Sequence, residues 1–344
     1  MLVVAFHACD KLARMDNANP SIAFPVGLTG VDIFFVVSGF IIFVTAKQSG
    51  AGPLSFMRKR LIRVVPLYWV LTLFLAAVAV VKPDLLATTV FDFRHFVASL
   101  LFIPWQHPQV GAMLPLLIPG WTLNYEMAFY VMFAVSLALP QSIRLWALLA
   151  LLAGLAAIGL AMPLSGIMAF YTDPIILEFA AGLLIAKAWT SGVTVPVKAA
   201  GIVTLIGFVL LVAGSEMTLP RIVGAGIPAF LIVGGAVFSE SRYKLNPSRT
   251  LVLLGDASYS IYLSHVLVLP VVAKVWLAMG LGGGSVIGLA FVVAAMTASA
   301  CAGVILYKLV ERPLLQWLSG KKQGRARPAS APGLEQAKLP GSSR

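Results

Sequence analysis

Five side chains of this sequence could take part in acid–base chemistry, although they lie within or beside long apolar runs. They are two histidines and three carboxylates: His7, Asp32, Glu126, Glu178 and His265. The imidazole of histidine has an unperturbed pKa of about 6.5 and can therefore accept a proton from a substrate hydroxyl near neutral pH. A carboxylate can orient such a base or hold a polar substrate. Ionisable groups are costly at membrane depth, so each of the five is a candidate for a functional role.

A basic stretch is the second feature with evident chemistry. Residues 58–63 read RKRLIR and place Arg58, Lys59, Arg60 and Arg63 within six positions. Guanidinium groups match phosphate oxygens in a bidentate way, which makes this cluster a candidate anion site. The cluster also separates two long apolar runs, and positive charge in that position marks a cytoplasmic loop. On charge alone both interpretations, anion site and orientation signal, stay open.

The composition predicts an all-α, polytopic membrane protein. The chain has 344 residues, of which 60% are hydrophobic and 11% charged, and its mean hydropathy is +0.95. A soluble domain of this length is not so apolar, and spanning helices satisfy their own backbone hydrogen bonds in lipid. The two cysteines, Cys9 and Cys301, have neither metal-like spacing nor a disulfide framework, and we predict no metal site.

Apolar runs predict about ten spanning helices. They cover residues 1–8, 28–46, 64–81, 121–139, 145–162, 167–186, 197–213, 219–238, 250–273 and 285–307. The first run is shorter than the roughly 20 residues that a spanning helix needs, so we expect the first helix to be truncated in this sequence. We expect loops at 9–27 and 47–63, and an interfacial or re-entrant stretch at 96–103.

The distribution of Lys and Arg supports this layout. The predicted cytoplasmic side has 19 of these residues and the outer side has 6, which together are all 25 in the chain. Cytoplasmic loops carry an excess of Lys and Arg, so both termini are predicted to be cytoplasmic. The net charge of +12 is therefore mostly topology and does not indicate a nucleic-acid partner. We predict a membrane domain at 1–318 and a basic, disordered cytoplasmic tail at 319–344.

The layout predicts that several ionisable groups share one depth. His7 ends the first helix at the outer face, Asp32 lies a turn inside the second, and Glu126 lies near the outer end of the fourth. Thr122, Glu126 and Tyr130 repeat every four residues and share a helix face, as do Ser258, Tyr262 and His265. Each of these residues also has a structural interpretation: an interfacial histidine, a carboxylate that complements a helix dipole, or an aromatic residue of the interfacial belt.

Six ordered motifs resemble those of the integral membrane acyltransferases of the acyltransferase 3 family. They are VVAFHA at 3–8, GVDIFFVVSGFII at 30–42, FMRKRLIRVVPLYW at 56–69, GWTLNYEMAFY at 120–130, SYSIYLSH at 258–265 and ERPL at 311–314. The resemblance covers residues 2–315 and is greatest to the branch that acetylates bacterial exopolysaccharides. In the family a basic residue precedes the histidine of the first helix by about three turns. This chain begins six residues before His7, so that partner is absent.

The resemblance implies transfer of an acyl group, usually acetyl, from acyl-coenzyme A to a hydroxyl of a polysaccharide or lipid-linked sugar. It implies a location in the bacterial inner membrane and no permanently bound cofactor, with acetyl-CoA as donor substrate. His7 is then the predicted base, with Glu126 and Asp32 in supporting catalytic roles. The predicted phosphate ligands of the donor are Arg58, Arg60 and Arg63. The residues predicted to bind the acceptor are Asn124, Tyr130, Tyr262 and His265.

Two questions stay open at this point. Because the donor is cytoplasmic and the polar cluster is near the outer face, the pantetheine arm must thread inward or the acyl group must be relayed. Ser38, Cys9 and Ser264 are the possible nucleophiles for a relay, and none is compelling. The alternative functions are a proton-coupled secondary transporter, which also needs membrane-embedded acids and histidines, and a flippase or polymerase subunit for polysaccharide precursors.

Overall fold

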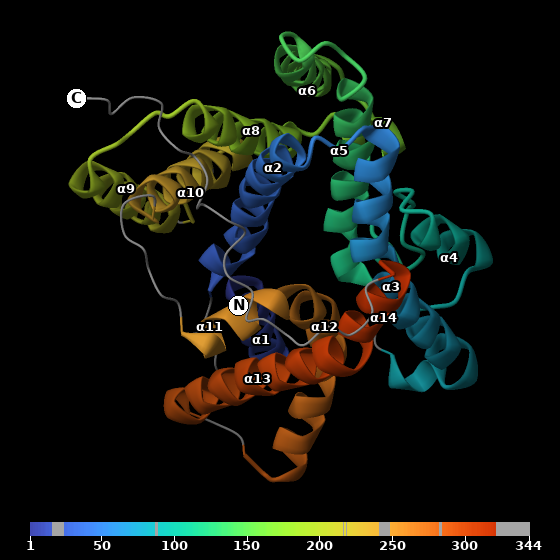
Figure 1. The fold of residues 1–344 in the computed structure, drawn as a ribbon. Helices are drawn as coiled ribbons and strands as arrows, with labels where there is room; N and C mark the ends of the chain where they lie inside the picture. Colours follow the sequence, from blue (N-terminus) through green and yellow to red (C-terminus); the bar gives the residue numbers. More distant parts are fainter. Residues whose placement is uncertain are drawn as a thin grey trace.

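The computed structural model describes residues 1–15, 24–86, 89–215, 217, 219–240, 248–281 and 284–320. These residues form a bundle of helices, and no strand occurs among them (Figure 1). In chain order the helices of the first half are α1 (Leu2–Met15), η1 (Pro25–Thr29), α2 (Gly30–Ser49), α3 (Pro53–Val81), η2 (Pro83–Leu85), α4 (Phe93–Leu100), η3 (Ile118–Gly120), α5 (Trp121–Ser136) and α6 (Arg144–Ala161). Those of the second half are α7 (Gly166–Tyr171), η4 (Pro174–Ile176), α8 (Leu177–Thr190), α9 (Val197–Ser215), η5 (Ile222–Gly226), α10 (Ile227–Glu240), α11 (Arg249–Asp256), α12 (Ser258–Ala278), α13 (Ser285–Leu306), η6 (Tyr307–Glu311) and α14 (Arg312–Leu318).

Eight helical segments of the described residues are long and apolar enough to cross a membrane, which makes this a multi-pass membrane protein. They are 25–49, 53–81, 144–161, 166–190, 197–215, 222–240, 258–278 and 285–318. The other two predicted spans correspond to α1, with 14 residues, and α5, with 16. The all-α prediction is confirmed, and spanning by α1 and α5 stays a prediction.

Two predicted loops are largely helical in the residues that the structure describes, which leave out 16–23 of the first loop. In the first, α1 continues to Met15 because Ala8, Cys9 and Leu12 pack against α12 and α13, while Asp10 and Arg14 form an ion pair one turn apart on the more exposed side. His7 therefore lies in the middle of a helix, not at its end. In the second, α2 runs to Ser49 and α3 begins at Pro53, so the basic stretch lies on a helix. The turn between them is made by Gly50, whose φ of +55° favours glycine.

Two other boundaries also differ from the predictions. The predicted span at 250–273 is broken at Ala257 into α11 and α12, because Gly255 and Asp256 interrupt the apolar run. The stretch predicted to be interfacial overlaps the short helix α4, which begins where the Asp92 carboxylate caps the His95 N–H at 2.7 Å. Residues 321–344 of the predicted tail, and Arg242 and Lys244 of the charge count, lie outside the described residues.

Close helix pairs organise the bundle. α2 packs along α8, α9 along α10, and α12 along α13 (Figure 1). The α2–α8 contact depends on glycine: a Cβ on Gly182 would lie 2.1 Å from the Val36 carbonyl oxygen, and one on Gly39 would lie 2.3 Å from that of Phe179. Such small residues let helix backbones approach within a membrane, where lipid removes most of the hydrophobic drive for association.

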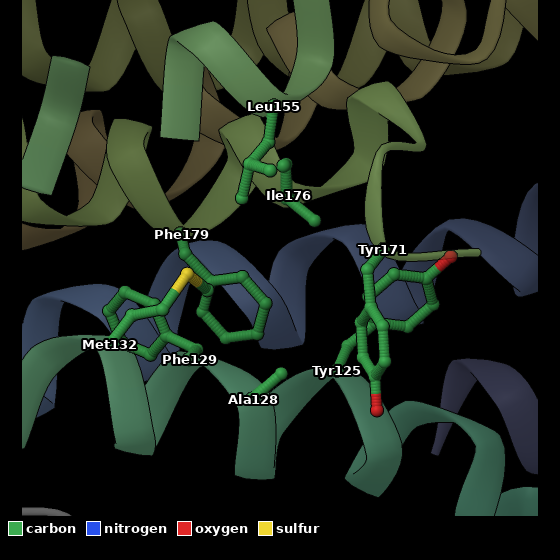
Figure 2. Close-up of a pocket in the computed structure, with 8 residues that line it drawn as sticks. All are labelled: Tyr125, Ala128, Phe129, Met132, Leu155, Tyr171, Ile176 and Phe179. Carbon is green, nitrogen blue, oxygen red and sulfur yellow. The ribbon is translucent and has the colours of Figure 1, made fainter. Parts of the chain in front are cut away.

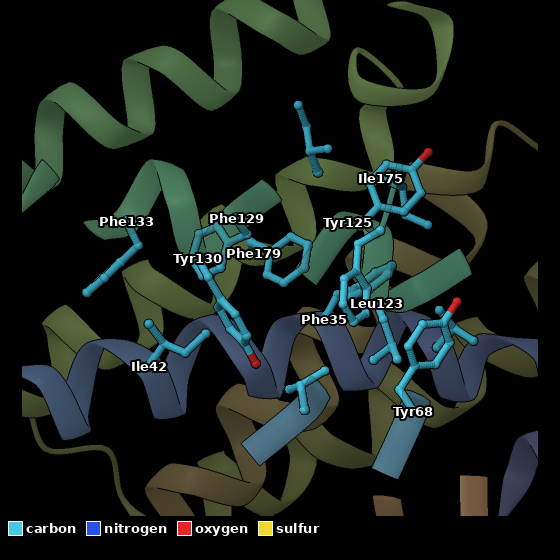
Figure 3. Close-up of a cluster of buried hydrophobic side chains, with 14 of the residues drawn as sticks. Phe35, Ile42, Tyr68, Leu123, Tyr125, Phe129, Tyr130, Phe133, Ile175 and Phe179 are labelled. Atoms are coloured by element: carbon cyan, nitrogen blue, oxygen red, sulfur yellow. The ribbon is translucent and has the colours of Figure 1, made fainter. Parts of the chain in front are cut away.

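The largest buried cluster lies among α2, α3, α5 and α8 (Figure 3). At its centre the ring of Phe179 stacks on Phe129 at 4.4 Å and lies 4.7 Å from Phe35. Beside it is an apolar cavity of about 70 Å³, lined by residues that include Tyr125, Phe129 and Phe179 (Figure 2). This cavity is too small for a sugar or a coenzyme, because ligand pockets typically measure about 300–1,000 Å³.

Candidate active site

Two histidines from opposite ends of the sequence meet inside the bundle. The imidazole of His7 on α1 and that of His265 on α12 have ring centroids 5.2 Å apart, with their planes inclined by 33°. His265 is fully buried, and its Nδ1 lies 2.5 Å from the backbone carbonyl oxygen of Tyr262. Because a carbonyl can only accept, that contact assigns the proton to Nδ1 and the lone pair to Nε2. Nε2 is buried and has no hydrogen-bond partner among the residues that the structure describes.

The position of His7 follows from how α1 is held. Its Ala8, Cys9 and Leu12 pack with Leu269 and Ala273 of α12, the helix that carries His265. On another side the chain entering α2 comes very close: a Cβ on Gly27 would lie 2.7 Å from the Leu2 carbonyl oxygen. The first helix is therefore held between α12 and η1, which places His7 against His265.

A hydroxyl pair connects the histidines to α5. The Tyr262 hydroxyl lies 3.1 Å from Thr122 Oγ1 and donates to the Pro119 carbonyl oxygen at 3.1 Å. The Tyr262 ring is 5.9 Å from that of His265 and nearly parallel to that of Phe34, at 6.5 Å. The face predicted for Tyr262 and His265 is therefore present, and it meets the face of α5 that begins with Thr122.

Glu126 lies one turn further along that face of α5, in a buried pocket of hydroxyl groups. Its Oε1 accepts hydrogen bonds from Ser38 at 3.1 Å and from Tyr130. The guanidinium of Arg60 lies over the Tyr130 ring at 5.9 Å, and the positive charges of Arg60 and Arg63 act on the carboxylate. Among the described residues, the hydrogen-bond partners of Glu126 are thus Ser38 and Tyr130, whereas the rings beside that of His7 are those of Phe6 and His265.

Asp32 lies in a different cluster from the histidines. Its carboxylate is 1% exposed and accepts two hydrogen bonds from Arg221, from Nε at 2.9 Å and Nη2 at 3.1 Å. The buried carboxyl of Glu178 lies beside this pair. The sequence predicts the depth of Asp32 in the membrane but not the side of α2 on which it lies. In the structure Asp32 lies on the side of α2 that faces α8 and η5. Arg221 went unnoticed in the sequence, where it counted only as an outer positive charge, although a buried aspartate at membrane depth requires a partner.

The three predicted phosphate-binding arginines occupy two faces of α3. Arg58 is exposed and lines a surface cavity of about 400 Å³ with apolar neighbours that include Leu61 and Leu318. Arg60 and Arg63 turn inward, where Arg60 Nη2 donates to Thr45 Oγ1 at 2.7 Å and Arg63 donates to Glu311. A helix turns 100° per residue, so positions 60 and 63 share a face that position 58 does not.

The remaining candidates differ in their surroundings. Asn124 is fully buried, and within the described part of the chain neither polar atom of its amide has a hydrogen-bond partner; the buried hydroxyl of Ser264 also lacks one there. Among the possible nucleophiles, Ser38 donates to Glu126, and Cys9 is packed in an apolar cluster. Glu311 was known only as part of a motif, and nothing in the sequence indicated that it pairs with Arg63.

Comparison with known proteins assigns this arrangement to a family. Residues 1–308 match the acyltransferase 3 family, described as an acyltransferase domain. The chain is 37% identical over 336 residues to the exopolysaccharide production protein ExoZ of Rhizobium meliloti (strain 1021), covering 95% of this chain and 97% of the relative. It is 25% identical over 346 residues to the acyltransferase MdmB of Streptomyces mycarofaciens, covering 89% and 84%. No solved structure matches. The chain belongs to the acyltransferase 3 family of membrane acyltransferases.

Proposed function

We propose that this protein O-acetylates exopolysaccharide in a bacterial inner membrane, using acetyl-CoA as donor and a hydroxyl of an extracytoplasmic or lipid-linked sugar as acceptor. The observation that carries the proposal is the 37% identity, along 95% of the chain, to a relative named for exopolysaccharide production. Membership of an acyltransferase family supports the reaction class. The acetyl group, the coenzyme A donor and the sugar acceptor belong to the proposal.

His7 is the proposed general base. A sugar hydroxyl is a poor nucleophile at neutral pH and needs a base within hydrogen-bond reach. As His7 takes the hydroxyl proton, the oxygen attacks the thioester carbonyl carbon, the C–S bond breaks, and the CoA thiolate leaves and takes up a proton. His265 supports the base, because its unprotonated Nε2 is the nitrogen without a partner and its ring lies beside that of His7.

The donor phosphates are proposed to bind Arg60 and Arg63, the two arginines that turn inward on α3. Polar side chains lead from there to the histidines. The charges of both arginines act on Glu126, Thr122 is one turn from Glu126 on α5, and Tyr262 connects Thr122 to His265. This line favours a pantetheine arm that threads between the helices over a relay through a serine or cysteine.

The acceptor is proposed to lie on the aromatic and hydroxyl groups around the histidine pair. Tyr262 is partly exposed, and Phe34, whose ring is nearly parallel to that of Tyr262, is 39% exposed. Aromatic faces of this kind suit the apolar face of a sugar ring, while the buried Asn124 amide has two unused polar atoms. Asp32 is proposed to contribute indirectly, by holding Arg221 and the outer ends of α2 and η5 together.

The test is transfer of label by the purified protein in liposomes. Acetyl-CoA labelled in the acetyl group is supplied on one side, with chemically deacetylated exopolysaccharide on the other. The expected result is labelled ester in the polysaccharide that mild alkali releases. Absence of ester at any donor concentration contradicts the proposal, and uptake of sugar into the vesicles without ester formation would instead indicate a transporter.

A further inference from the structure

Three motifs that are far apart in the sequence meet at one buried carboxylate. Glu311 of the ERPL motif is 1% exposed. Its Oε1 accepts a hydrogen bond from Arg63 of the basic stretch, and its Oε2 accepts one from the Ser260 hydroxyl, at 2.5 Å, in the SYSIYLSH motif. The proposed function assigns no role to Glu311 or Ser260.

Arg63 retains free binding capacity in this arrangement. Its side chain is 40% exposed, whereas that of Glu311 is almost fully buried. Glu311 takes a hydrogen bond from Nη1, and a guanidinium has five N–H donors in a rigid fork, so donors remain for a phosphate. The Tyr259 ring lies 5.9 Å from the guanidinium and limits it on another side. The ion pair thus fixes one edge of the Arg63 fork and leaves another for a ligand.

The backbone around Glu311 is built to hold this position. Glu311 ends the π-helical segment η6 and is followed at once by the last helix, which begins at Arg312 and has Pro313 as its second residue. Short π-helical turns are rare and occur frequently at functional sites, because they shift the helical register of a side chain. Nearby, a Cβ on Gly303 would lie 2.4 Å from the side chain of Ile261, so α13 meets α12 closely beside Ser260. The carboxylate therefore joins α3, α12 and the end of α13 at a fixed place.

We propose that Glu311, fixed by Ser260, is a positioning residue that aims the Arg63 guanidinium at a phosphate group of the acyl-CoA donor. The inference rests on the proposed function, since it assumes that donor. Glu311 does not itself touch the donor: it acts through Arg63. Loss of a well-aligned charge-assisted hydrogen bond to a phosphate weakens binding by about 10- to 100-fold, so orienting one arginine can determine the affinity for the donor.

The first experiment compares Glu311→Gln with the parent protein in donor kinetics and direct CoA binding. Gln keeps the shape of the side chain and removes the charge that holds Arg63. The expected result is a rise of about 10- to 100-fold in the donor KM and in the Kd for CoA, with kcat at saturating donor little changed. Ser260→Ala should shift both constants in the same direction and by less. Arg312→Gln, the exposed neighbour, is the matched control and should leave both constants unchanged.

The second experiment exchanges the charges, in the double variant with Arg63→Glu and Glu311→Arg. If the pair positions a phosphate ligand, the exchange recovers thermal stability lost in the single variants but not CoA affinity. Recovery of both, or a parental CoA Kd in both Glu311→Gln and Ser260→Ala, overturns the inference and leaves a structural ion pair. A parent protein that binds no CoA overturns the proposed function as well. If Glu311→Gln does not fold, Ser260→Ala decides, because it leaves the ion pair in place.

Discussion

The Nε2 of His265 is buried and has no hydrogen-bond partner among the described residues, while the His7 ring lies beside the His265 ring. Two imidazoles in contact cannot both be charged cheaply, so the pair is suited to carrying a single proton. On this basis we expect His7→Gln to lower acetyl transfer by about 10²–10⁴-fold without loss of membrane insertion, because Gln keeps a polar side chain but cannot act as the base. Label transfer by the purified variant measures the effect.

Arg14→Gln is the control for that prediction, since Arg14 lies on the same helix and its side chain is 72% exposed. It should retain the parental rate. If His7→Gln also transfers label at the parental rate, His7 is not the base, and His265 becomes the first alternative.

Glu126 offers a second test at the scale of the residue. Its carboxylate is buried, and its bonds from Ser38 and Tyr130 suit an ionised acceptor. We expect Glu126→Gln to reduce acetylation strongly while the protein still reaches the membrane, because the neutral amide cannot balance the positive charges of Arg60 and Arg63. Tyr130→Phe removes only one hydrogen bond and should cost less, about 0.5–3 kcal/mol of transition-state stabilisation. Full activity in Glu126→Gln would show that the charge is not required.

At the scale of the element, sequence patterns predict where helices lie along the chain better than they predict which helices pack against each other. Apolar runs predict the spanning helices, and ionisable residues within those runs predict the candidate site residues, because both patterns are local in the sequence. The pairing of Asp32 with Arg221 joins residues 189 positions apart, and that of Arg63 with Glu311 joins residues 248 apart. Those contacts depend on which helices lie side by side and on how each is rotated. A span that is hydrophobic on all sides carries no pattern for that rotation.

The α2–α8 contact gives a prediction for an element pair. A side chain at Gly182 has no room, because its Cβ would lie 2.1 Å from the Val36 carbonyl oxygen. We expect Gly182→Leu to separate the helices and to lower the free energy of unfolding by about 1–3 kcal/mol or more, measured by thermal unfolding in detergent. Gly154→Leu is the matched control, because a Cβ on Gly154 meets nothing within 4 Å. Equal effects of the two variants would contradict the close approach of α2 and α8 at Gly182.

At the scale of the whole molecule, most of the positive charge and the buried carboxylates have different roles. Most Lys and Arg residues lie on the predicted cytoplasmic side, whereas Arg221 and Arg63 pair with buried carboxylates and hold distant helices together. An orientation can be predicted from the sequence because it depends on a sum over many loops, and here it stays a prediction. The split of the polar residues into a histidine pair, a glutamate pocket and an aspartate pair could not, since it depends on the lateral order of helices in the bundle.

The orientation is itself testable with reporters. A phosphatase that is active only outside the cytoplasm should be silent when fused after Arg344 and active when the chain is cut and fused after Leu164, in the turn between α6 and α7. A fluorescent protein that folds only in the cytoplasm should give the opposite pattern. We expect this pattern because the predicted cytoplasmic side has 19 Lys and Arg residues and the predicted outer side has 6, and cytoplasmic loops carry the excess of these residues. Phosphatase activity after Arg344 would contradict this orientation. Arg60 and Arg63, which turn toward the interior of the bundle, would then lie near the outer face, and a cytoplasmic donor could not bind them from the cytoplasm.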